Sequence, residues 1–157
     1  MNDWDLRAGE NHERIFLLVE DNPEDAFLME IELTRMPGCR LCILKDGQQA
    51  VDYIEGRPPY DDRREFPLPD LILLDLKLPR VDGFEFLKWL RSRSLDDVAA
   101  IPVIIISSSD SKEHVKEAYK LGANFYLGKP LNFDAFSDRI RLLGLVWGEY
   151  AETLKHA

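Results

Sequence analysis

The chain has 157 residues, which is long enough for one domain with a substantial core but short for two. Its apolar content of 45% and charged content of 31% are typical of a globular domain, and its net charge of −9 disfavours direct binding to nucleic acid. The sequence has no run of 18 apolar residues and no apolar signal core at its polar N-terminus, so we expect no membrane span and a cytoplasmic protein.

The first half of the chain predicts two strands and two helices after a loose polar arm over residues 1–13. Asn22 and Pro23 suit the N-cap and the first position of a helix. Apolar residues recur at helical spacing in this helix at Phe27, Leu28 and Ile31. The expected strands are 15–20 and 40–44, and the expected helices are 23–35 and 47–55.

The second half predicts three more strand–helix pairs after a proline-rich loop at 56–69, which is either a functional loop or a solvated connector. The expected strands are 70–75, 102–107 and 124–127. A helix over 83–93 should turn Phe86, Leu87 and Leu90 inward. Asp110 and Glu113 resemble a capping box, Gly122 a C′ glycine, and the last helix should begin near Leu131.

This alternation of strands and helices defines the expected fold class. The strands are nearly continuous runs of Ile, Leu and Val, which is typical of strands covered on both faces. Crossovers between parallel strands are right-handed. We therefore predict an α/β protein with a doubly wound, five-stranded parallel sheet.

Polar side chains follow four of the predicted strands, where ligands bind in open α/β sheets. Glu20, Asp21 and Asp75 would repel one another unless a proton or a cation intervened, and Mg²⁺ suits such carboxylates. One carboxylate could then attack a phosphoryl donor, while Lys129 and Ser107 stabilise the charge on its oxygens. Each of these residues alone could be an ordinary surface residue, such as an acid in a loop or an exposed lysine. Their occurrence after successive strand ends favours one shared site.

These motifs together resemble the receiver domain of two-component response regulators. The matching residues are Glu20-Asp21, Asp75 followed by Leu78-Pro79 and Asp82-Gly83, Ser107, Tyr126 and Lys129-Pro130. The resemblance covers residues 14–147 and leaves a short tail at 148–157. It implies a flavodoxin-like sheet with the strand order 2-1-3-4-5.

The resemblance also implies a phosphorylation site. Asp75 would accept a phosphoryl group from a histidine kinase, and Lys129 would pair with that group. Asp21, Asp75 and the backbone carbonyl of Lys77 would bind Mg²⁺ directly, and Glu20 would act through water. Beyond its own phosphorylation and dephosphorylation, such a domain is not an enzyme.

A conformational switch is the second implication. Ser107 would swing in to bond the phosphoryl group, and Tyr126 would report the change. Ser107 stands where threonine is commoner and retains the hydroxyl. The proline-rich loop at 56–69 and the aromatic Trp147 resemble single-domain regulators paired with phytochrome-type histidine kinases.

Two other functions compete with this interpretation. A phosphatase of the haloacid-dehalogenase type also uses an aspartate nucleophile, Mg²⁺ and a lysine, but it needs an acid two residues after the nucleophile, where this chain has Lys77. An interaction domain that works without phosphorylation is the other alternative. The tail is too short for a DNA-binding or catalytic output domain, so we expect output through protein contacts.

The cysteines and histidines favour structural roles. Cys39 and Cys42 form a C-x-x-C pair, but on a strand they would point to opposite faces, which favours two half-buried side chains over a redox or metal site. His12, His114 and His156 lie in polar stretches, and we expect them to be solvated and away from the acidic rim.

The last helix carries more apolar residues than one buried stripe needs. The stripe expected to pack on the sheet is Phe136, Ile140, Leu143 and Trp147. The apolar residues off this stripe are Phe133, Leu142, Leu145 and Val146. We predict a homodimer through the last helix, the fifth strand and the preceding helix. The alternative is that the tail from Gly148 to Leu154 folds back over these residues.

Overall fold

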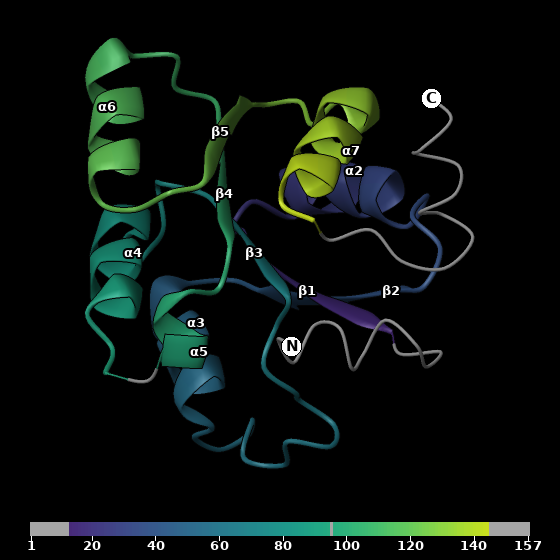
Figure 1. The fold of residues 1–157 in the computed structure, drawn as a ribbon, viewed down its shortest axis with the longest axis vertical. Helices are drawn as coiled ribbons and strands as arrows, with labels where there is room; N and C mark the ends of the chain where they lie inside the picture. The colour runs from purple at the N-terminus through teal and green to yellow at the C-terminus, as the bar shows by residue number, and fades with distance from the viewer. Residues whose placement is uncertain (1–12, 95, 145–157) are drawn as a thin grey trace.

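The structure, a computed structural model, describes residues 13–94 and 96–144. Five parallel strands form one sheet in the order β2-β1-β3-β4-β5 (Figure 1). The strands are β1 (Arg14–Val19), β2 (Cys39–Leu44), β3 (Leu71–Leu74), β4 (Val103–Ser107) and β5 (Phe125–Gly128). The predicted doubly wound sheet and its strand order are confirmed.

Helices cover both faces of the sheet (Figure 1). α3, α4, α5 and α6 lie on one face, and α2 and α7 lie on the other. The helices are α2 (Pro23–Leu33), α3 (Gly47–Glu55), α4 (Gly83–Arg91), α5 (Asp96–Ala99), α6 (Lys112–Lys120) and α7 (Phe133–Leu142). The four-residue α5 was not predicted, because so short a segment carries no helical periodicity.

The central strands are buried on both faces, as their continuous apolar runs predicted. Alternate residues enter two separate cores: Leu17 and Ile72 face α3 and α4, whereas Phe16 faces α2 and α7. Phe16 meets Phe136 of α7 edge to face, with ring centroids 6.0 Å apart. Burying each large side chain contributes roughly 1.5–3 kcal/mol, so the two cores fix the strands whose ends carry the polar rim.

The start of α2 follows its sequence signals, but its buried face does not. Asn22 caps the helix, and its side chain accepts hydrogen bonds from the backbone N–H groups of residues 24 and 25 at 2.9 and 3.1 Å. Phe27, Leu28 and Ile31 are 61%, 53% and 47% exposed. The buried residues are Ala26, Met29 and Leu33. The apolar spacing therefore marked an exposed surface of α2.

Two helix starts differ from the prediction. Ser111, rather than Asp110, caps α6, and its hydroxyl accepts the backbone N–H of His114 at 3.4 Å. α7 begins at Phe133 behind the cap Asn132, two residues later than expected. Gly122 follows Leu121, the C-cap of α6, and has φ +103°, so the prediction that it is the C′ glycine is confirmed.

The proline-rich loop is ordered by packing and by one arginine. The rings of Tyr60 and Phe66 pack on Tyr53 of α3, with centroids 5.2 and 6.0 Å away. Arg63 donates hydrogen bonds to the carbonyl oxygens of Tyr53 and Ile54 at 2.7 and 2.6 Å, which satisfies the end of α3. The loop thus belongs to the end of the sheet opposite the polar rim, since it leads into the start of β3.

Cys39 and Cys42 are free and half-buried on β2, and they pack in the two different cores, as predicted. Burial raises the pKa of the Cys39 thiol to about 12, which keeps it protonated and unreactive. Across the residues that the structure describes, no helix is both long and apolar enough to cross a membrane.

Candidate functional site

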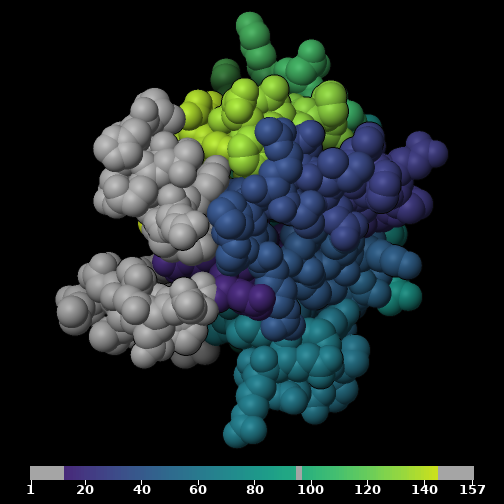
Figure 2. All heavy atoms as spheres, turned by 90° about the vertical axis from the view of Figure 1, so that its right-hand side faces the viewer, coloured from purple at the N-terminus to yellow at the C-terminus, as the bar shows by residue number. Residues whose placement is uncertain are grey.

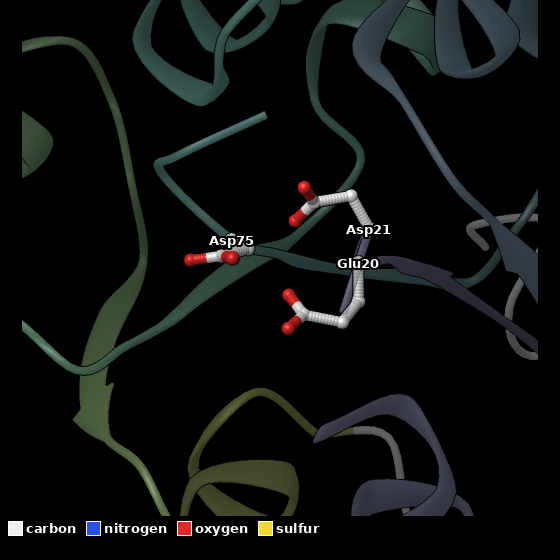
Figure 3. A group of neighbouring side chains, drawn as sticks. All are labelled: Glu20, Asp21 and Asp75. Carbon is white, nitrogen blue, oxygen red and sulfur yellow. The ribbon is translucent and has the colours of Figure 1, made fainter. Parts of the chain in front are cut away.

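The ends of β1 and β3 bring three carboxylates together. The two strands are neighbours with Val19 opposite Leu74, so the residues that follow them lie side by side. The side-chain oxygens of Glu20, Asp21 and Asp75 lie within 4.8 Å of one another. Figure 3 shows the three carboxylates turned to the same side of the strand ends. The structure therefore assembles the predicted acidic cluster.

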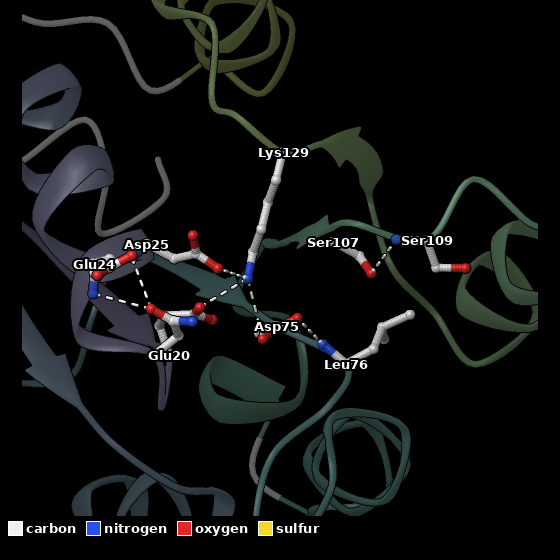
Figure 4. A network of polar contacts seen from close by, with 9 residues as sticks. Glu20, Glu24, Asp25, Asp75, Leu76, Ser107, Ser109 and Lys129 are labelled. Carbon is white, nitrogen blue, oxygen red and sulfur yellow. Dashed lines mark hydrogen bonds and ion pairs between the residues drawn. The ribbon is translucent and has the colours of Figure 1, made fainter.

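Lys129 reaches this cluster from the end of β5 (Figure 4). Its Nζ donates hydrogen bonds to Glu20 at 2.7 Å, to Asp25 at 2.9 Å and to Asp75 at 3.2 Å. Its backbone N–H donates to the carbonyl oxygen of Ser107 at 2.9 Å, which ties the chain after β5 to the end of β4. The peptide bond between Lys129 and Pro130 is cis.

Crowding of charge changes the protonation of the cluster. Burial, and then the neighbouring Asp75, raise the pKa of Glu20 to about 8, although the Lys129 ammonium opposes this shift. Burial lowers the pKa of Lys129, but hydrogen bonds to Glu20 and Asp25 and the charge of Asp75 outweigh it, so the net shift is upward. The hydrogen bond from Lys129 lowers the pKa of Asp25. The cluster thus holds more negative charge than one ammonium neutralises.

The chemistry of this cluster fits a hard divalent cation. Glu20 is 1% exposed, and among the described residues its Oε2 atom has no hydrogen-bond partner. A buried carboxylate oxygen without a partner is costly unless a cation or an ordered water satisfies it. The oxygens of Glu20, Asp21 and Asp75 are the ligand type that Mg²⁺ and Mn²⁺ prefer. Lys77 is exposed in the loop after Asp75, and the role of its backbone carbonyl stays a prediction.

The Asp82-Gly83 motif positions the backbone of Asp75. Asp82 caps α4 by accepting the backbone N–H of Glu85 at 2.9 Å. A Cβ atom at Gly83 would lie 2.3 Å from the carbonyl oxygen of Asp75, so only glycine allows α4 to begin against this strand end. Gly83 N–H donates to the carbonyl of Leu76 at 2.9 Å. The backbone of Asp75 and Leu76 is therefore held against the start of α4.

The predicted switch residues, Ser107 and Tyr126, both form hydrogen bonds with Ser109, and the swing of Ser107 toward a phosphoryl group stays a prediction. Ser107 is 2% exposed, and its Oγ accepts the backbone N–H of Ser109 at 3.1 Å. The hydroxyl of Tyr126 donates to the carbonyl oxygen of Ser109 at 2.7 Å. Figure 4 shows Ser107 and Ser109 on the far side of Asp75 from Asp25. The hydroxyls of Ser107 and Tyr126 thus form hydrogen bonds with the backbone of the loop after β4.

His114 of α6 contacts the same loop through Ser109, so the prediction of a solvated side chain is wrong. It is half-buried, its Nδ1 lies 2.7 Å from the Ser109 hydroxyl oxygen, and its ring meets Phe84 edge-on at 5.9 Å. Three residues that contact the predicted site residues or their partners were not predicted from the sequence: Asp25, Ser109 and His114. Asp25 gave no distinctive signal, because acids are common in the first turn of any helix. His12 and His156 lie outside the described residues.

The predicted dimer surface is only partly described. On α7, Phe136 and Ile140 are buried and Leu143 is half-buried, as the stripe predicted. Phe133 is half-buried with the Arg35 guanidinium 4.2 Å above its ring, so it belongs mainly to the core. Leu142 is 67% exposed. Leu145, Val146 and Trp147 lie outside the described residues. Figure 2 shows α2 and α7 side by side on this face.

The sheet order, the acidic cluster and the lysine define the class of protein. The chain belongs to the response regulator receiver domain family, which matches residues 16–141. Among curated proteins, the response regulator Rcp1 of Synechocystis sp. is 33% identical over 140 residues, or 88% of this chain and 92% of Rcp1. The probable methanogenesis regulatory protein FilR2 of Methanothrix harundinacea is 36% identical over 139 residues, or 85% of this chain and 83% of FilR2.

Solved structures of response regulators are similar as well. The bacteriophytochrome response regulator AtBRR superposes with a TM-score of 0.76 at 36% identity, covering 87% of this chain and 96% of AtBRR. The Mn²⁺-bound form of Rcp1 superposes with a TM-score of 0.69 at 32% identity, covering 87% of this chain and 95% of Rcp1. The predicted resemblance to single-domain regulators related to phytochromes is confirmed.

Proposed function

We propose that this protein is a single-domain response regulator whose Asp75 accepts a phosphoryl group from a histidine kinase. The observation that carries the proposal is the joining of Asp75, two further carboxylates and the Lys129 ammonium at one rim. The coverage of 92% of Rcp1 supports a single-domain regulator. Signalling then proceeds through protein contacts.

The transfer step needs one bond made and one broken. An oxygen of Asp75 attacks the phosphorus of a phosphohistidine, a P–O bond forms, the P–N bond breaks, and the imidazole leaves with its electron pair. Lys129 stabilises the charge on the phosphoryl oxygens. Attack by water on the acyl phosphate later returns the carboxylate and inorganic phosphate.

Mg²⁺ is the proposed cofactor, and Glu20, Asp21 and Asp75 are the residues that would hold it. When bound, it neutralises the carboxylates and phosphoryl oxygens. Support comes from the mutual distance of 4.8 Å or less and from the buried Oε2 of Glu20. The Mn²⁺ in the Rcp1 structure supports a divalent ion of this kind.

Incubation with acetyl phosphate and Mg²⁺, followed by intact-mass measurement, tests the proposal. The wild type should gain one phosphoryl group that hydroxylamine removes, and Asp75→Asn should gain none while remaining folded. Continuous release of phosphate would indicate a phosphatase, and no labelling of the wild type would indicate an interaction domain. Equal labelling of the wild type and Asp75→Asn would exclude Asp75 as the acceptor.

The proposed phosphodonor is a phytochrome-type histidine kinase. The support is the similarity to AtBRR and Rcp1, at 36% and 33% identity. Transfer from candidate autophosphorylated kinases, compared at short times, tests this link. A phytochrome-type kinase should label Asp75 faster than an unrelated kinase at equal concentration.

A homodimer through α6, β5 and α7 is the proposed assembly. The described surface offers Leu142 of α7 and Tyr119 of α6, which are 67% and 47% exposed. Leu142→Glu should give a folded monomer by light scattering. Phe27→Glu, on α2 at 61% exposure, is the matched control and should leave the dimer intact. A wild-type monomer, with or without phosphorylation, would contradict the proposal.

A further inference from the structure

Asp25 is the partner of Lys129 that lies outside the candidate metal set. The Lys129 ammonium donates to Glu20, Asp25 and Asp75 at 2.7, 2.9 and 3.2 Å, which engages each of its N–H groups. Glu20 and Asp75 belong to the set of carboxylates that could share a cation, whereas Asp25 does not. Figure 4 shows the ammonium between Asp25 on one side and Asp75 on the other.

The backbone fixes the position of Asp25. Pro23 opens α2, and the Asn22 side chain accepts the backbone N–H of Asp25 at 3.1 Å, so this residue is set in the first helical turn. Its side chain is 36% exposed, against 13% for Lys129. The backbone of Asp25 is thus fixed at the mouth of the site, and its carboxylate accepts a hydrogen bond from the Lys129 ammonium.

A cation bound at the acidic cluster would engage two of the three carboxylates that contact Lys129 and leave the third, Asp25, unengaged. A cation shared by Glu20, Asp21 and Asp75 would repel the ammonium and take up the charge of two of its partners. A cavity of about 250 Å³ opens beside the ion pair, so an ammonium without a partner has space to turn away from Asp75. The cavity is lined by Asp25, Leu28, Met29, Ser108, Lys129, Pro130 and Leu131. Asp25 is the carboxylate that remains to hold the ammonium in place.

We propose that Asp25 is a positioning residue that keeps the Lys129 ammonium beside Asp75 while the other carboxylates bind the metal. Asp25 acts through Lys129 and does not touch the phosphoryl group. This inference rests on the proposed function. It adds to that function a residue that holds the Lys129 ammonium in position before the phosphoryl group arrives.

The inference can be tested by measuring the affinity for beryllium trifluoride, an anionic mimic of the phosphoryl group, by calorimetry in saturating Mg²⁺. The test is whether Asp25→Asn binds this anion more tightly or more weakly than the wild type. Simple electrostatics predicts that Asp25→Asn binds the anion more tightly, because a nearby negative charge is lost. Positioning predicts that the variant binds it about threefold to tenfold more weakly, because Lys129 loses its remaining partner. Binding by Asp25→Asn that equals or exceeds that of the wild type would overturn the inference.

Glu24→Gln is the matched control. It removes the same charge from the same helical turn, and Glu24 is exposed with no ion pair to Lys129 among the described residues. Its affinity for the anion should equal or exceed that of the wild type. Asp25→Glu restores the charge and should bind more tightly than Asp25→Asn, and Asp25→Ala provides a second removal of the carboxylate. A wild type that fails to bind the probe would count against the proposed function itself, whereas a wild type that binds it no more tightly than Asp25→Asn would reject the role of Asp25 alone.

Discussion

The polar rim has two halves that are held in different ways. The carboxylate half consists of Glu20, Asp21, Asp75 and Lys129. Lys129 forms ion pairs with Glu20 and Asp75, from which it is separated by 109 and 54 positions in the chain, and the Asp21 carboxylate lies beside these two acids. The hydroxyl half, Ser107, Ser109, His114 and Tyr126, is joined by hydrogen bonds between residues 2, 5 and 17 positions apart. The first half therefore depends on strands that are distant in the sequence, whereas the second is joined through Ser109 in the loop after β4 and involves only β4 and the elements that follow it.

This difference separates chemistry from switching. Asp75 and Lys129 already face each other at 3.2 Å, so the groups of the transfer step are in place before any phosphoryl group arrives. Within the described part of the chain, the hydrogen bonds of the Ser107 and Tyr126 hydroxyls lead to the backbone of Ser109. A phosphoryl group that draws Ser107 toward Asp75 would break a neutral bond of modest strength, which costs about 1 kcal/mol. We therefore expect the two halves to respond separately to substitution.

Asp21→Ala should give the largest effect, on the carboxylate half. Loss of a carboxylate from the cluster should slow Mg²⁺-dependent labelling of Asp75 by roughly 100-fold, because the metal loses a direct ligand. Time-resolved intact-mass measurement with acetyl phosphate gives the rate. Asp61→Ala, in the exposed loop far from the rim, is the control and should label normally. Normal labelling by Asp21→Ala would refute the metal role.

The stability of the metal-free protein should depend on pH, because Glu20 of the same half is buried beside a carboxylate that repels its charge. The folded pKa of Glu20 is about 8 against 4.5 for the free group, so the folded state keeps a proton that the unfolded state releases between these values. The free energy of unfolding should therefore fall as the pH rises through this window. At about 1.4 kcal/mol per pKa unit, the loss amounts to a few kcal/mol.

Thermal unfolding across this window, with and without Mg²⁺, measures the effect. Added Mg²⁺ should raise Tm most at the alkaline end, where Glu20 has lost its proton. Glu20→Gln should flatten the metal-free curve, since the titrating group is gone. A wild-type Tm that is constant or rises with pH would show that Glu20 is ionised throughout.

Ser107→Ala should affect the hydroxyl half alone. Labelling of Asp75 should stay within a few-fold of the wild type, because Lys129 and the acids are untouched. The coupling between phosphorylation and partner or dimer affinity should fall by about 1–2 kcal/mol, as the phosphoryl group loses its hydroxyl donor. Ser107→Thr should retain the coupling. Full phospho-dependence in Ser107→Ala would exclude this hydroxyl as the link.

The same division marks what the sequence could predict. Glu20, Asp21, Asp75, Ser107 and Lys129 were found because strand ends in a parallel sheet share one edge, and that edge follows from the apolar runs. Asp25 and His114 were not found, because their roles depend on where a lysine 104 residues away and a serine hydroxyl come to lie. The exposed face of α2 was missed for a similar reason. Three apolar residues at helical spacing do not say which side of the helix meets the sheet.

Tyr126→Phe should give the smallest effect and the cleanest separation of the two halves. It removes one hydroxyl from a half-buried ring whose only described role in the rim is the 2.7 Å bond to the Ser109 carbonyl. The free energy of unfolding should drop by about 1 kcal/mol, which lowers Tm by a few degrees. The labelling rate of Asp75 should stay within about twofold of the wild type, because the ion pairs of the carboxylate half do not pass through Ser109. Mass-detected labelling and thermal unfolding of the same samples check both values. If Tyr126→Phe slowed labelling as much as Asp21→Ala does, the hydroxyl half would be part of the transfer chemistry, and the two halves would have to be treated as one network.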